Sequence, residues 1–173
     1  MHNQNQKALN ALLALAMAFG YMLIFAYNNT PLGAAVGSDN AMYLTLGTAL
    51  AEGRAPYVDV FDHKGPLLFM LYALGAAISD TSFIGVFALE VLSLAAAVYA
   101  GWRTVSLFGE GRLTLLSMPI LAAVVCCCTA FTQGGSAEEF ALPALAVGVC
   151  LTLAAMTRPE EKTRGRMLGF GAA

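Results

Sequence analysis

Long stretches without charged residues constrain this sequence more than any other feature. No charged side chain occurs between Lys7 and Asp39. The apolar part of that gap, from Ala8 to about Tyr27, is long enough to cross the roughly 30 Å hydrocarbon core of a bilayer. Further charge-poor stretches run from Phe83 to Trp102, from Leu113 to Phe131 and from Phe140 to Met156. They predict an all-α membrane protein with about four transmembrane helices in a single module over residues 1–173.

The composition supports this class and excludes others. Hydrophobic residues make up 58% of the chain and charged residues 12%, whereas a soluble domain has about 45–50% and 25%. A net charge of −2 leaves no basic surface for a phosphate backbone, so nucleic acid is excluded as a partner. The four cysteines show no zinc or disulfide spacing. A signal peptide is the alternative for the first span. A signal peptide has a shorter apolar core, however, so the full length of this apolar stretch favours an uncleaved helix.

The stretch Gly65 to Ile78 is too short for a comfortable span and predicts a short re-entrant or interfacial helix. If it does not cross, a cytoplasmic N-terminus places seven of the nine basic residues inside and only Arg54 and Lys64 outside. If it does cross, six of those seven lie outside, against the positive-inside rule. We therefore expect a multi-pass plasma-membrane protein with outside loops at about 28–82 and about 132–139.

The first outside loop should contain two helices. Ser38 is a good N-cap for an amphipathic helix that runs to Glu52, lies along the membrane surface and ends at Gly53. Its apolar face should consist of Met42, Tyr43, Leu46, Ala49 and Leu50. We expect 54–65 to be extended, and Pro66 to occupy the first position of the short helix.

The polar residues of the loops each have a structural interpretation. Asp39 can complement a helix dipole, Lys64 can reach the lipid headgroups, and Asp59 and Asp62 can be solvated. Ser136 and Glu139 form a capping-box pattern. Glu90 lies within a span, where an acid either is functional or makes a local hydrogen bond. The residues alone do not decide between these structural interpretations and a functional role.

Two strings of the first loop, GSDNAMYL and AEGRAPYVDVFDHKGPLLF, resemble the first extracytoplasmic loop of C-type glycosyltransferases. This superfamily of polyprenyl-phosphate-sugar-dependent enzymes includes protein O-mannosyltransferases and aminoarabinose transferases. The second loop, QGGSAEEFALP, resembles the family's second acidic loop, and the resemblance covers about residues 8–160. Many relatives have Asp-Glu where this chain has Asp39-Asn40, and Lys-Pro-Pro where it has Lys64-Gly65-Pro66.

The resemblance implies roles for particular residues. Asp39 would be the general base for an acceptor hydroxyl, and Glu138 or Glu139 would hold the acceptor or a divalent ion such as Mg²⁺ or Mn²⁺. Lys64 would contact the lipid phosphate. The remaining candidates for substrate binding are His63, Tyr57, Asp59 and Arg54.

These roles suit the chemistry of transfer from a polyprenyl-phosphate sugar to an extracytoplasmic acceptor. A carboxylate can deprotonate the attacking hydroxyl, and a cation can stabilise the departing phosphate. The expected partners are a lipid-linked sugar, membrane lipid and a missing C-terminal part of the same enzyme, without which we expect 1–173 to be inactive. The alternative is a non-catalytic membrane subunit or transporter-like partner that binds a lipid phosphate with the same loop.

Overall fold

A computed structural model describes residues 2–31, 38–129, 131 and 134–157. Its described residues form helices and no strand, in the order α1 His2–Phe25, α2 Ser38–Ala51, α3 Pro66–Ile78, α4 Ile84–Val105, the 3-10 helix Arg112–Leu116, α5 Ser117–Cys126 and α6 Ala137–Thr157. The expected basic loop with Arg158, Lys162, Arg164 and Arg166, and the apolar stretch from Met167, lie outside the described residues.

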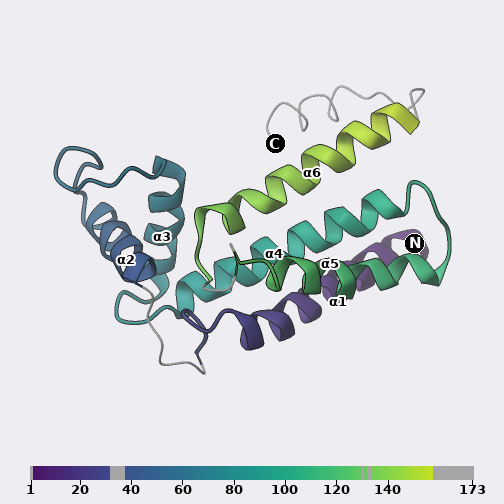
Figure 1. Ribbon diagram of the computed structural model, residues 1–173, viewed down its shortest axis with the longest axis horizontal. Helices are drawn as coiled ribbons and strands as arrows, with labels where there is room; N and C mark the ends of the chain where they lie inside the picture. The colour runs from purple at the N-terminus through teal and green to yellow at the C-terminus, as the bar shows by residue number, and fades with distance from the viewer. Residues whose placement is uncertain (1, 32–37, 130, 132–133, 158–173) are drawn as a thin grey trace.

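Helices α1, α4, α5 and α6 form an elongated bundle, and their directions alternate in the order in which they follow along the chain (Figure 1). Helices α1 and α5 run toward the end that carries α2 and α3, whereas α4 and α6 run away from it. Small residues allow close contact in the bundle core: Ala14 and Ala18 of α1 and Ala122 of α5 are buried beside Leu94 and Val98 of α4. Such packing by small side chains is typical of membrane helices.

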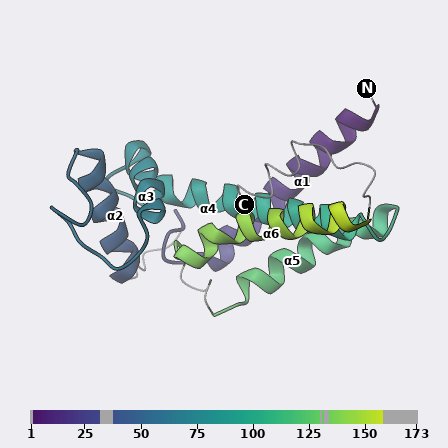
Figure 2. The same ribbon diagram turned by 90° about the horizontal axis from the view of Figure 1, so that it is seen from above.

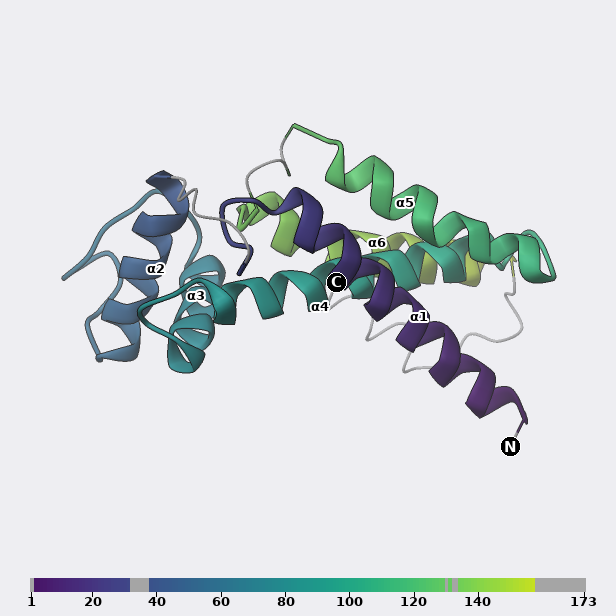
Figure 3. The same ribbon diagram turned by 90° about the horizontal axis from the view of Figure 1, so that it is seen from below.

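Helices α2 and α3 form a separate pair beyond one end of the bundle (Figure 2). Gly47 lets α2 approach α3 closely, since a Cβ atom at Gly47 would lie 2.5 Å from the backbone carbon of Tyr72. The pair has its own apolar core, which includes Tyr43, Leu46, Phe69 and Tyr72. Helix α3 therefore lies at the end of the bundle and does not run along it (Figure 3).

Three helices are long and apolar enough to cross a membrane by length and composition: Gln4–Phe25, Ile84–Val105 and Ala137–Thr157. They indicate a membrane location and match three of the four expected spans. The expected span 113–131 differs, because it begins as a 3-10 helix and its α-helical part ends at Cys126. Pro119 has no N–H to donate to the preceding turn, so it is tolerated only near the start of α5.

The bounds of α2 and α3 agree closely with the sequence prediction. Helix α2 ends at Ala51, and the expected stop residue Gly53 has φ 88° and donates its N–H to the carbonyl of Leu50, while Arg54 donates to that of Ala49. This pair of bonds is a Schellman motif. The predicted apolar face of α2 was wrong in part: Met42 is exposed and Leu44 is buried. The buried face is turned because α2 meets α3 at Gly47.

Residues 54–65 form a compact loop of turns, whereas we expected an extended segment. Asp59 Oδ2 accepts a hydrogen bond from the N–H of Ala55 at 2.8 Å, and the N–H of Tyr57 donates to Val60. Tyr57 has φ 66°, a left-handed conformation that costs a non-glycine residue about 1–3 kcal/mol. Local side-chain to backbone hydrogen bonds therefore shape this loop.

Candidate functional site

A pocket of about 360 Å³ lies where α2, the loop before α3 and the start of α6 meet. It combines one basic and two acidic side chains, Lys64, Asp39 and Glu138, which come from three separate segments of the chain. Its remaining lining residues are Asn40, Tyr43, Thr129, Gly134, Ser136 and Ala137. The structure thus brings together three of the residues that the sequence singled out.

Lys64 is held at this pocket by its backbone. Its N–H donates to the buried Asp62 carboxylate at 2.8 Å, and its carbonyl accepts the Tyr57 hydroxyl at 2.7 Å. The Lys64 ammonium lies 3.9 Å from Glu138 Oε1, with the lysine side chain 27% exposed. A partly solvated cation whose backbone is held at the pocket is well suited to an anionic ligand.

Asp39 lies in the first turn of α2, where the helix dipole stabilises its negative charge. Tyr43 follows one turn later and also lines the pocket. Burial raises the pKa of Tyr43, and the Asp39, Asp62 and Glu138 carboxylates raise it further. The Tyr43 phenol therefore stays protonated at neutral pH and can donate a hydrogen bond.

The two adjacent acids of the second loop have different surroundings. Glu138 is exposed and lines the pocket. Glu139 is buried, and neither of its carboxylate oxygens accepts a hydrogen bond from the residues that the structure describes. The N–H of Glu139 donates to Ser136 Oγ at 3.1 Å, which is the helix cap that we expected. Of the two, only Glu138 can meet Lys64 in the pocket.

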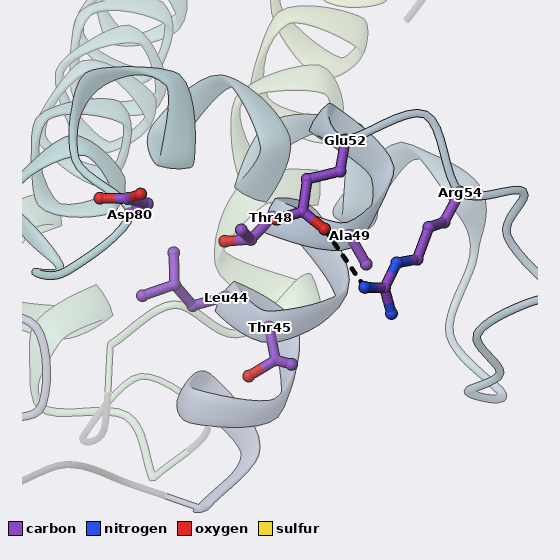
Figure 4. Close-up of a pocket in the computed structure, with 7 residues that line it drawn as sticks. All are labelled: Leu44, Thr45, Thr48, Ala49, Glu52, Arg54 and Asp80. Atoms are coloured by element: carbon purple, nitrogen blue, oxygen red, sulfur yellow. Dashed lines mark ion pairs between the residues drawn. The ribbon is translucent and has the colours of Figure 1, made fainter.

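Four candidate binding residues do not line this pocket. Arg54 pairs with Glu52 at 3.4 Å beside a different groove on α2 (Figure 4). His63 is mostly exposed to solvent and lies 3.3 Å from Asp62. Tyr57 and Asp59 instead hold the loop that carries Lys64. The positions of Tyr57 and Asp59 support a structural role in that loop, and Arg54 can serve as a control for Lys64.

A buried polar network lies directly beneath the pocket, and sequence reasoning missed most of it. Glu90 Oε1 accepts a hydrogen bond from Asn29 Nδ2 at 2.5 Å. Asn40 Nδ2 donates to Asn29 Oδ1 at 3.0 Å and to the Gly134 carbonyl at 2.8 Å. The one sequence feature that pointed to this network was Glu90, an acid within an apolar span, which marks a functional candidate.

Tyr72 and Gly135 complete this network. The Tyr72 hydroxyl donates to the Gly135 carbonyl at 2.8 Å and lies 3.3 Å from Asn40 Oδ1. Burial, with Glu90 and Glu139 nearby, raises the pKa of Tyr72 well above its usual range, so the phenol remains a donor. Gly135 has φ 71°, and a Cβ atom there would collide with the Tyr72 hydroxyl. Only glycine fits this position.

The donor set does not fit a divalent metal centre. Among the described residues, no three His, Cys, Asp or Glu side chains come close enough together to hold an ion. The pocket that contains Asp39 and Glu138 also contains the Lys64 ammonium, whose charge opposes a second cation. We therefore assign no chemical step to a metal.

An apolar groove of about 300 Å³ adjoins the pocket between α5 and α6. Glu138 lines both hollows. The other lining residues of the groove are Val124, Val125, Cys128, Phe131, Glu139 and Leu142. A charged hollow and a mainly apolar one thus lie on either side of Glu138.

Compared with protein families, with curated proteins and with solved structures, the chain matches none of them. Its function must therefore be inferred from the site itself.

Proposed function

We propose that this protein is a membrane glycosyltransferase, or the part of one that holds its donor, and that it takes a sugar from a polyprenyl-phosphate donor. The observation that carries the proposal is the pocket in which Asp39, Lys64 and Glu138 meet at one end of an apolar bundle. One cation and two carboxylates are the groups that transfer from a phosphate-linked sugar needs.

The residues have distinct tasks in this reaction. Asp39 accepts the proton of the acceptor hydroxyl while that oxygen forms its bond to the anomeric carbon. The bond between the anomeric carbon and the phosphate oxygen breaks through an oxocarbenium-like state. The phosphate leaves with an added negative charge, which the Lys64 ammonium stabilises. Glu138, next to Lys64, holds hydroxyl groups of the acceptor.

The neighbouring apolar groove supports a lipid-linked donor over a soluble sugar phosphate. Five of its seven lining residues are apolar, and it shares Glu138 with the pocket. A donor with a phosphate at Lys64 and a hydrocarbon chain in the bilayer would meet matching surroundings at both ends. A soluble sugar phosphate has no part that matches the groove.

Binding of undecaprenyl phosphate to the 173-residue chain in nanodiscs tests the donor half of this proposal. We expect Lys64→Ala to weaken binding by about 10- to 100-fold, the loss typical of a charge-assisted hydrogen bond, and Lys64→Arg to retain part of it. Arg54→Ala is the matched control, because Arg54 is a basic residue of the same loop outside the pocket.

Unchanged affinity in Lys64→Ala, or an equal loss in Arg54→Ala, would remove the phosphate contact. Binding that depends on Lys64, in a protein that transfers no sugar to any acceptor, would favour the non-catalytic lipid-phosphate-binding subunit.

A further inference from the structure

Glu90 is an acidic side chain that lies fully buried within the bundle. It lies in α4, about 9 Å of helix axis inside Ile84 at 1.5 Å per residue. None of the described ion pairs includes it. Burying a carboxyl group without a cation is costly unless hydrogen bonds satisfy it. The polar groups that Glu90 contacts therefore decide what it can do.

The contacts of Glu90 lead directly to the pocket. Its Oε1 accepts the Asn29 amide, and Asn29 Oδ1 accepts the Asn40 amide. Asn40 lines the pocket and is the neighbour of Asp39 in the first turn of α2. Asn40 also donates to the Gly134 carbonyl, so the same network fixes the segment that leads to Glu138.

We infer that Glu90 is a positioning residue of the pocket: through Asn29 and Asn40 it couples the membrane helix α4 to the first turn of α2, and so holds Asp39 opposite Glu138. This inference concerns the geometry of the pocket. Only its expected effect on donor binding rests on the proposed function. Glu90 itself lines none of the hollows described above, so it acts through Asn29.

Exchanging donor and acceptor between two side chains gives a sharp test. Asn29→Asp removes the amide that Glu90 accepts and brings two carboxyl groups together. Glu90→Gln keeps the acceptor oxygen at nearly the same size. In the double variant Asn29→Asp/Glu90→Gln, the new glutamine amide can donate to the new aspartate, whose second oxygen still accepts from Asn40. The bond is restored with its direction reversed.

The primary readout is amide hydrogen exchange of α2 and of 134–136, followed by mass spectrometry. We expect exchange in α2 to accelerate about 10- to 100-fold in Asn29→Asp, the factor for losing a buried hydrogen bond. Exchange in the far half of α4 and in α5 should not change. Glu90→Gln and the double variant should resemble the wild type.

Ser93→Ala is the matched control. Ser93 lies one turn from Glu90 on α4, and its buried hydroxyl donates to the Glu139 carbonyl at 3.0 Å, outside the path to Asn40. It should leave α2 exchange unchanged. The inference is overturned if Asn29→Asp does not affect α2, if the double variant is no better than Asn29→Asp, or if Ser93→Ala has the same effect.

Affinity for undecaprenyl phosphate, measured on the same variants, separates this inference from the proposed function. If both hold, affinity falls in Asn29→Asp and returns in the double variant. If α2 exchange follows the expected pattern but the wild type binds no undecaprenyl phosphate, the positioning role stands and the proposed function fails.

Discussion

At the scale of single residues, Lys64 and Glu138 form a pair that a ligand can open. Their charged atoms are 3.9 Å apart, and Glu138 is 64% exposed. An exposed pair of this kind contributes at most about 1 kcal/mol. An incoming phosphate can therefore displace Glu138 from Lys64 at little cost, which frees the glutamate for an acceptor.

This competition predicts that Glu138→Gln increases affinity for undecaprenyl phosphate by about two- to fivefold, because the amide neither neutralises Lys64 nor repels the phosphate. Titration of the variant in nanodiscs measures the change. Glu52→Gln is the control, since Glu52 forms a comparable exposed pair with Arg54 outside the pocket. A lower affinity in Glu138→Gln would show that Glu138 supports donor binding and does not compete with it.

At the scale of elements, the sequence predicted helices better than it predicted their contacts. Pro66 and Gly53 carry strong local signals, and α2 and α3 begin and end near the predicted residues. The buried face of α2 depends on its approach to Tyr72 at Gly47, which no local pattern encodes. The Asn29–Glu90 bond joins residues 61 positions apart, so composition and periodicity could not reveal it.

Helix α3 presents an apolar stripe to its surroundings. Leu67, Met70, Leu74 and Ile78 are all more than half exposed and repeat at helical spacing. If α3 lies in the membrane interface, a nitroxide label on Leu74→Cys should be relaxed more by oxygen than by an aqueous nickel chelate. A label on Thr45→Cys, at an exposed position of α2, should respond in the opposite way. Equal exposure to the nickel chelate at both sites would contradict the interfacial position.

At the scale of the whole molecule, the bundle has two chemically different ends. Asp39, Lys64 and Glu138 lie at the end with α2 and α3. Lys7 lies near the start of α1 and Arg103 near the end of α4, both at the opposite end. This separation agrees with the charge asymmetry that predicted a cytoplasmic N-terminus. The orientation across the membrane stays a prediction.

Thiol labelling in intact cells tests that orientation. In a variant that lacks Cys126, Cys127, Cys128 and Cys150, a cysteine at Ala55 or Ala137 should react with an impermeant maleimide added outside. A cysteine at Gly111, in the turn at the other end of the bundle, should react only after the membrane is permeabilised. Labelling of Gly111→Cys from outside, with protection of Ala137→Cys, would place the pocket on the cytoplasmic face.

The central claim is that Asp39 is the base of a sugar transfer in this pocket, and the most direct measurement is the transfer rate of Asp39→Asn from a polyprenyl-phosphate sugar. The amide keeps the shape of the side chain but cannot accept the proton, so we expect a loss of about 10²- to 10⁴-fold with donor affinity retained. Asp59→Asn, an equal change in the same loop but outside the pocket, should transfer at nearly the wild-type rate. Near-normal transfer by Asp39→Asn, or an equal loss in Asp59→Asn, would contradict the account.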